Sequence, residues 1–222
     1  MNTISDFIPL FLNDLNAAHI IFKLLLLNNV EINKEIYDIV QKNILEIAKH
    51  KHGCCSIQKI LEYDKDNTEN LVAEIFKFSV VLLKEQFGNF LIHYLITYKD
   101  KKYTKPLVNL IKPHFVELCQ QKYSSSAIEK FFENCSEEEK DPFYYAISEI
   151  QNFKQVILNK FGNYVIQKMI DRTQNQRIKV YFLGMVASLS ELLIQEPFGK
   201  QIFGKFYKIY PEFRNIVRAN NS

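Results

Sequence analysis

The 222-residue chain has little cysteine, glycine or proline, and the way each is used excludes a class of protein. The four cysteines contain no CxxC pair, which argues against a zinc ribbon or a disulfide scaffold and indicates a reduced, intracellular protein. Glycine and proline number six each, and no Ser/Gly-rich stretch occurs. We therefore expect one ordered domain without a flexible linker or a disordered tail.

The chain also lacks a strong charge and a long hydrophobic run. Its net charge of +3 is compatible with a polyanionic partner but too small to indicate one. Asp6, Asn13 and Asp14 lie where a secretory signal would need lysine or arginine. The most apolar stretch, residues 20–27, contains Lys23 and is too short to span a bilayer. These features predict a protein of the cytoplasm, or alternatively of the nucleus or nucleolus, that has no contact with membrane.

Motifs of catalysis are missing as well. The sequence shows no Gly-rich phosphate loop, nucleophile elbow, paired catalytic carboxylates or HExxH, so we expect neither an enzyme nor a cofactor. One cluster invites a metal interpretation, because His50, His52, Cys54 and Cys55 lie close together in the sequence. No second ligand pair follows at a familiar spacing, and we predict no metal site.

What the chain does have is an internal repeat. Related six-residue segments begin at residues 18, 54, 89, 125, 163 and 200, so successive starts are 35 to 38 residues apart. We call each segment a motif and number its positions from one to six. A period of this length is typical of a solenoid, in which each unit buries its apolar face only against its neighbours.

The residues around the fifth motif show the helical character of the repeat. Apolar residues recur at the spacing of one helix face, and Asn163 and Gln167 lie one turn apart on the opposite flank. No stretch shows the alternation of a strand, which predicts an all-α fold. Glycine directly precedes four motifs, where it permits close approach of a helix or a ligand, or a sharp entry turn; these are Gly53, Gly88, Gly162 and Gly199.

At these residues the chain resembles the Pumilio-homology (PUF) family of single-stranded RNA-binding proteins. The similarity is carried by KFGNYVIQKMID at 160–171, KHGCCSIQKILE at 51–62, EQFGNFLIHYLI at 85–96 and QKYSSSAIEKFF at 121–132. The closing segment at 196–210, with the motif at 200–205, is similar to the family's C-terminal cap repeat. Four motifs in register over residues 15–210 make the resemblance specific.

The resemblance implies a right-handed α-solenoid, a crescent of three-helix repeats, in which each repeat reads one RNA base. Residues 1–222 would then form a single PUF domain, a short member with four readable repeats and caps. The first and fifth residues of a motif would contact the base edge, and the second would stack between adjacent bases. The first motif, 18–23, has Ala18 and Phe22 at its reading positions, and we interpret it as a degenerate or capping repeat.

Hydrogen-bonding chemistry supports the transfer of these roles. Ser125 with Glu129 offers a carboxylate that accepts from the N1–H and N2–H₂ donors of guanine, whereas the amides of Asn163 and Gln167 match uracil. The pair Cys54 with Gln58 implies adenine. The pair Asn89 with His93, which has histidine in place of the usual glutamine, implies uracil. Because the family binds RNA antiparallel, the implied core is 5′-UGUA-3′.

Stacking and flanking roles are uneven along the chain. Two of the second-position residues are aromatic and could alternatively serve packing between repeats. The predicted stacking residues are His19, Cys55, Phe90, Ser126 and Tyr164, and Lys200 and Gln201 are candidates for contacts with the 5′ flank. A lysine recurs at the sixth position, either along the RNA or as a solvated row; the row is Lys23, Lys59, Lys130, Lys168 and Lys205.

Several functions remain open at this stage. The first is recognition of a UGUA-containing mRNA 3′ untranslated element for post-transcriptional regulation, with recruitment of effector proteins of mRNA decay or translation. Alternatives are a ribosome-biogenesis relative that grips RNA without strong base preference, and a helical-repeat scaffold for protein partners. The apolar stretch at 20–27 also suggests a homodimer, formed alone or on RNA.

Exchanging one pair tests the register of the motifs. The double variant Ser125→Asn, Glu129→Gln removes the carboxylate that accepts two guanine donors and installs the amide pair found at 163 and 167. We expect the preference to change from UGUA to UUUA, by about 1–3 kcal/mol by analogy with other bidentate base contacts. Anisotropy titrations with the two oligomers measure it, and a double variant that still prefers UGUA shows that the register is wrong.

Overall fold

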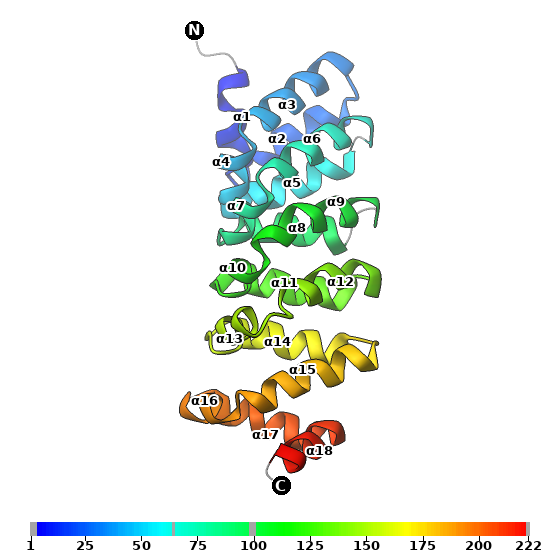
Figure 1. The fold of residues 1–222 in the computed structure, drawn as a ribbon. Helices are drawn as coiled ribbons and strands as arrows, with labels where there is room; N and C mark the ends of the chain where they lie inside the picture. The colour runs from blue at the N-terminus through cyan, green and yellow to red at the C-terminus, as the bar shows by residue number, and fades with distance from the viewer. Residues whose placement is uncertain (1–3, 64, 98–100, 221–222) are drawn as a thin grey trace. The chain divides into compact units, whose positions relative to one another are not determined.

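A computed structural model describes residues 4–63, 65–97 and 101–220, and the regular structure in these ranges is helical without any strand (Figure 1). The all-α prediction is confirmed. The chain divides into two compact units, unit 1 at Met1–Ile111 and unit 2 at Lys112–Ser222. Each unit contains three repeats of three α-helices: a first helix, a second helix with the motif in its first turns, and a third helix. We call the second one the motif helix.

Unit 1 contains the first three repeats. Its motif helices are the second of each triplet, and a 3₁₀ turn (η1, Lys101–Tyr103) precedes its last helix. The repeats are α1 (Ile4–Leu12), α2 (Ala18–Leu26) and α3 (Val30–Lys42); α4 (Ile44–Lys49), α5 (Lys51–Tyr63) and α6 (Lys65–Lys77); α7 (Ser79–Lys84), α8 (Gly88–Thr97) and α9 (Thr104–Ile111).

Unit 2 repeats the plan after a second 3₁₀ turn (η2, Lys112–His114), which contains Pro113 and separates it from α9. Its repeats are α10 (Phe115–Cys119), α11 (Lys122–Asn134) and α12 (Glu137–Ala146); α13 (Ile150–Ile157), α14 (Gly162–Arg172) and α15 (Gln176–Ser188); α16 (Ser190–Gln195), α17 (Gly199–Ile209) and α18 (Pro211–Asn220). One apolar pattern, 178–193, spans two of these helices. It breaks at Leu189, whose φ of −100° and ψ of 10° leave the α region, because α15 packs on α18 and α16 packs on α17.

The motif helix begins against the backbone of the helix before it. A Cβ atom built on Gly162 would lie 2.4 Å from the carbonyl oxygen of Val156, six residues earlier in the chain. Gly53, Gly88 and Gly199 face the residue six positions earlier in the same way. The fourth repeat has Ser124 at this place, and its hydroxyl donates to the carbonyl of Leu118 at 2.6 Å. In the second to sixth repeats this position thus holds either no side chain or one that bonds the facing carbonyl.

Aromatic residues build much of the core of unit 2. Phe115, Phe131, Phe132 and Phe143 are buried, with ring centroids 4.6–6.2 Å apart. They come from α10, α11 and α12, so one cluster joins all three helices of a repeat. Complete burial of such a side chain stabilises the fold by about 1.5–3 kcal/mol.

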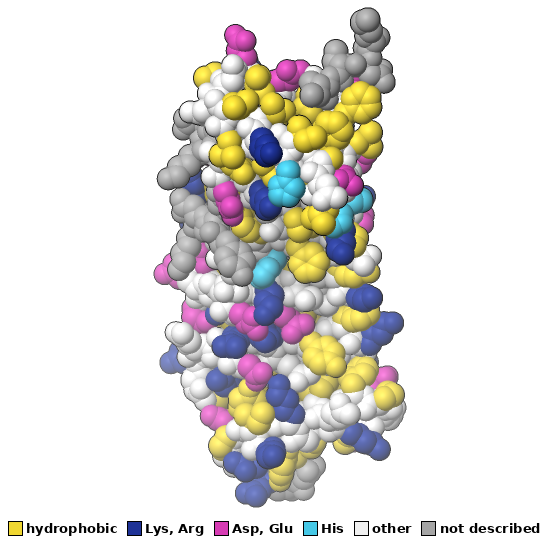
Figure 2. Space-filling view, turned by 180° about the vertical axis from the view of Figure 1, so that it is seen from behind, with side chains coloured by type: hydrophobic (Ala, Val, Ile, Leu, Met, Phe, Trp, Pro, Cys, Tyr) yellow, Lys and Arg dark blue, Asp and Glu magenta, His cyan; other side chains and the backbone are white. Residues whose placement is uncertain are grey.

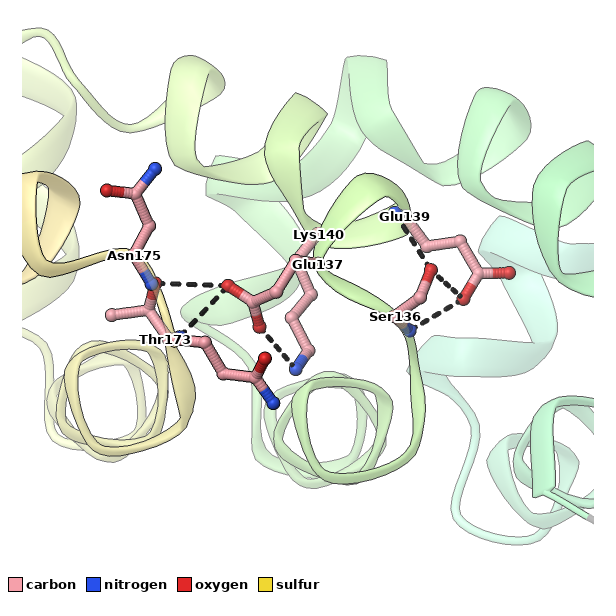
Figure 3. Close-up of polar contacts among 7 residues, drawn as sticks. Ser136, Glu137, Glu139, Lys140, Thr173 and Asn175 are labelled. Atoms are coloured by element: carbon pink, nitrogen blue, oxygen red, sulfur yellow. Dashed lines mark hydrogen bonds and ion pairs between the residues drawn. The ribbon is translucent and has the colours of Figure 1, made fainter.

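Polar contacts add a connection between neighbouring repeats at the start of α12 (Figure 3). Ser136 and Glu139 form a capping box that satisfies free N–H groups of the first turn. Glu137 reaches the next repeat, where its carboxylate accepts from the Thr173 hydroxyl at 3.2 Å and the backbone N–H of Gln174 at 3.1 Å. The acidic run at 137–139 therefore forms the first turn of α12.

The N-terminal repeat has an apolar surface that its own helices leave open. Val30 is 81% exposed and Leu27 is 69% exposed, and Leu10, Leu15 and Leu26 are also exposed. Figure 2 shows hydrophobic side chains gathered at this end of unit 1. Within the described residues, no helix is long and apolar enough to cross a membrane.

Substitution of glycine separates close approach from helix propensity. We expect Gly162→Ala to lower the free energy of unfolding by about 1–3 kcal/mol, because its methyl group overlaps the Val156 carbonyl. Gly184→Ala in α15 is the matched control, since a Cβ there has no atom within 4 Å. It should be neutral or stabilising by about 0.5–1 kcal/mol. Urea unfolding measures both, and equal effects of the two substitutions contradict the packing argument.

Candidate nucleic-acid interface

The four predicted reading pairs have a common arrangement on their motif helices. In α5, α8, α11 and α14 the first-position residue is buried, the second-position residue is exposed, and the fifth-position residue is partly buried. Asn163, for example, is only 2% exposed. The first and fifth residues lie one turn apart in each helix. A buried amide or hydroxyl at a recurring place differs from a polar residue that merely keeps a helix soluble.

The buried first-position side chains donate hydrogen bonds to backbone carbonyls of the preceding turn. The Nδ2 group of Asn89 donates to the carbonyls of Glu85 at 2.8 Å and Gln86 at 2.9 Å. Asn163 Nδ2 donates to the carbonyls three and four residues earlier, at 3.1 and 3.0 Å. A carbonyl only accepts, so each Asn Oδ1 must point away from that turn. In α14 it accepts from Nε2 of the fifth-position Gln167 at 3.1 Å.

The two smaller first-position residues follow the same rule with one donor each. Ser125 Oγ donates to the carbonyl of Lys122 at 3.3 Å, and Cys54 Sγ donates to that of Lys51 at 3.4 Å. Burial raises the pKa of the Cys54 thiol to about 12, and the neighbouring Cys55 adds to the shift. Cys54 is therefore a neutral thiol at physiological pH, which is unsuited to metal binding or nucleophilic attack.

The surroundings of Cys54 bear on the metal interpretation. The rings of His50 and His52 have centroids 5.9 Å apart, but the described residues contain no group of three His, Cys, Asp or Glu side chains placed to hold a metal ion.

Glu129 lies in a mixed electrostatic environment between two helices. Burial raises its pKa, with a further contribution from Glu133, while Lys168 and Lys130 act in the opposite direction. The carboxylate is thus partly desolvated, where hydrogen-bond donors are worth more than in open water. Such a group suits recognition of a base edge that presents two N–H donors.

The predicted stacking residues are accessible. Phe90 is 53% exposed and Tyr164 is 56% exposed. His19, Cys55 and Ser126 are exposed at the same motif position. Large aromatic rings that were needed for packing between repeats would be buried, so their exposure favours a surface role.

The row of sixth-position lysines has a role that the sequence analysis did not predict. Lys168 of α14 pairs with Glu133 of α11 at 2.6 Å, and Lys205 of α17 pairs with Asp171 of α14 at 3.2 Å. Lys130 also pairs with Glu133, and the two hydrogen bonds lower the pKa of this carboxylate to about 2. Lys59 of α5 lies 5.0 Å from the ring centroid of Phe22 in α2. Lys59, Lys168 and Lys205 thus link neighbouring motif helices. For Lys168 and Lys205, the signal in the sequence was an acidic residue eight positions after the preceding motif begins.

The terminal repeats differ from the middle ones. In α2, Ala18 and Phe22 are buried, and the Phe22 ring stacks on Tyr63 with centroids 6.1 Å apart. Phe22 is a packing residue, in agreement with a capping repeat. In α17, Lys200 and Gln201 are exposed, as flanking contacts require.

One groove lies away from all predicted reading residues. It has a volume of about 590 Å³ and lies between α12 and α15, with Tyr144, Tyr145 and Tyr181 in its wall. None of the predicted base-reading residues lines this groove. The arrangement of the motif helices therefore indicates the candidate RNA surface better than the groove does.

Comparison with known proteins decides the family. Three segments match the model of the Pumilio-family RNA binding repeat, at residues 43–76, 114–148 and 152–181. The chain is a Pumilio-family repeat protein. The matched segments contain the pairs of α5, α11 and α14, whereas the Asn89–His93 repeat, which departs from the usual pair, lies outside them.

Relatives of this Pumilio-family chain are longer proteins. It is 31% identical over 208 residues to Pumilio homology domain family member 4 of Saccharomyces cerevisiae, covering 87% of this chain and 23% of that protein. It is 32% identical over 198 residues to Pumilio homolog 9 of Arabidopsis thaliana, covering 86% and 33%. The chain thus spans a quarter to a third of these relatives.

A solved structure confirms the fold class. The Puf4 RNA binding domain bound to the HO endonuclease RNA 3′ UTR recognition sequence has a TM-score of 0.79 and 28% sequence identity. The match covers 90% of this chain and 65% of that one. The α-solenoid of three-helix repeats that the family resemblance implied is therefore confirmed.

Proposed function

We propose that this chain binds single-stranded RNA and reads a 5′-UGUA-3′ core, one base for each of four repeats. In this proposal the pairs of unit 2, at 163/167 and 125/129, read U and G. The pairs of unit 1, at 89/93 and 54/58, read U and A. Both units together act as one PUF domain over residues 1–222. Family membership supports RNA binding, and the structure supports the choice of reading residues.

The single observation that carries the proposal is the repeated geometry of the motif helices. In four motif helices the first residue is buried and its donor group is hydrogen-bonded to the preceding turn, and the fifth residue, one turn away, is partly buried. Two of these helices also have an exposed aromatic ring at the second position. A helical-repeat scaffold for protein partners has no need for this set at one period. A row of edge-reading groups with stacking faces between them suits splayed-out bases.

The biological role follows from what such binding can do. A protein that recognises a short mRNA element without catalysis acts by bringing other factors to the transcript. We therefore include recognition of 3′ untranslated elements, translational or decay effectors as partners, and a cytoplasmic location in the proposal. The Puf4 complex, with its 3′ UTR sequence, supports this choice of target.

Titration of two oligomers tests the function. We expect the chain to bind a UGUA oligomer more tightly than a UUUA oligomer by a factor of roughly 5 to 150, because Glu129 accepts from two adjacent donors of guanine, whereas uracil presents only its N3–H. Anisotropy at several salt concentrations measures both affinities. Equal affinities with steep salt dependence would support backbone gripping instead, and absence of binding would support a protein scaffold.

A second proposal concerns the apolar N-terminal end, which would associate with the same surface of another copy on RNA carrying two UGUA elements. Linking two sites raises apparent affinity without new base contacts. Light scattering should show a dimer on two-element RNA, and Leu27→Glu, Val30→Glu should abolish it while binding to one element persists. A monomer on both RNAs, with no gain in affinity from the second element, rejects this proposal.

A further inference from the structure

A directed chain of hydrogen bonds runs from the last repeat into the reading pair of α14. Lys205 Nζ donates to Gln167 Oε1 at 3.1 Å, and Gln167 Nε2 donates to Asn163 Oδ1 at 3.1 Å. Asn163 Nδ2 in turn donates to the carbonyls of Asn159 and Lys160. Every link has its donor on the side of Lys205 and its acceptor on the side of the α14 backbone.

The two ends of this chain leave the amides one orientation. An ammonium group only donates and a backbone carbonyl only accepts, so neither end can reverse. Rotating the Gln167 amide by 180° would set its NH₂ group against Lys205 and its oxygen against Asn163 Oδ1. Both bonds would be lost, and partly buried donors and acceptors would remain unpaired. Without Lys205, the single bond from Gln167 Nε2 to Asn163 Oδ1 is left to orient the amide, and the amide turns over at the loss of one hydrogen bond instead of two.

The last repeat holds Lys205 in position. Its ammonium also pairs with Asp171 at 3.2 Å, and the Tyr210 hydroxyl donates to the same carboxylate. In the preceding repeat, Lys168 occupies the same motif position and pairs with Glu133, the counterpart of Asp171. Lys205 adds to this shared ion pair a hydrogen bond to a reading residue.

Amide orientation matters most between uracil and cytosine. Uracil presents a donor at N3 and an acceptor at O4, whereas cytosine presents an acceptor at N3 and a donor at N4. A freely rotating amide can match either base by turning over, but a fixed amide matches only one. We propose that Lys205 is a positioning residue that makes the α14 pair distinguish uracil from cytosine. This inference rests on the proposed function, in which that pair reads the first base of UGUA.

The test compares affinities for UGUA and CGUA oligomers. Wild-type protein should prefer UGUA by roughly tenfold or more, the scale of a good bidentate base contact. Lys205→Met should reduce this ratio to about threefold or less, mainly through tighter binding of CGUA. Lys205→Arg keeps a donor-only group and should retain the ratio. Lys200→Met, on the same helix, removes an exposed cation and should weaken both complexes equally.

The outcomes separate this inference from the proposed function. If Lys205→Met weakens both complexes by one factor, lysine contributes only charge and the inference is wrong, while preference for UGUA over UUUA keeps the function. If wild-type protein shows no base preference at either position, both are wrong. If circular dichroism shows that Lys205→Met does not fold, Lys205→Gln replaces it. A glutamine at 205 can donate to or accept from the Gln167 amide, so it does not fix the orientation of that amide. An unchanged ratio in that variant overturns the inference.

Discussion

The contact on which the reading surface depends is the close approach of each motif helix to the carbonyl of the short helix before it. Gly162 faces the Val156 carbonyl with no room for a Cβ atom, and Ser124 bonds the carbonyl of Leu118 at the same place. The next residue in the chain is the first position of the motif. Its burial and its bonds to the preceding turn follow from this approach, because the helix start has no freedom to shift outward.

Neighbouring repeats share charges as well as apolar surface. Glu133 receives Lys130 from its own helix and Lys168 from the next, and Glu137 accepts two donors from the following repeat. Burial raises the pKa of Glu137, yet the bonds from Lys140 and Gln174 outweigh it and the pKa is lowered. A repeat in such an array therefore owes part of its stability to residues roughly one period away, as expected for a solenoid.

The sequence predicted the features that depend on periodicity. Apolar spacing gave the helices, the 35–38-residue period gave the solenoid, and the glycine before the motif indicated close approach. Periodicity alone does not decide between two explanations that share one pattern. The stripe at 178–193 suits one long helix as well as two helices of adjacent repeats, and only tertiary packing selects the break at Leu189. Likewise, Lys168 and Lys205 pair with Glu133 and Asp171 of the preceding repeat, and the regular spacing of these acids does not by itself show that they pair. Base preferences remain predictions, because neither the sequence pattern nor the fold contains the hydrogen bonds between these side chains and RNA.

The inward-facing donors of the first position restrict which residues evolution or a protein engineer can place there. Asparagine, serine and cysteine each donate to a carbonyl of the preceding turn, whereas an aspartate would set a carboxylate against those oxygens. The fifth position has no such obligation and holds glutamine, histidine or glutamate. An acid can thus occupy the fifth position of a motif but not the first, so fewer residue pairs are possible in a repeat than two freely variable positions would allow.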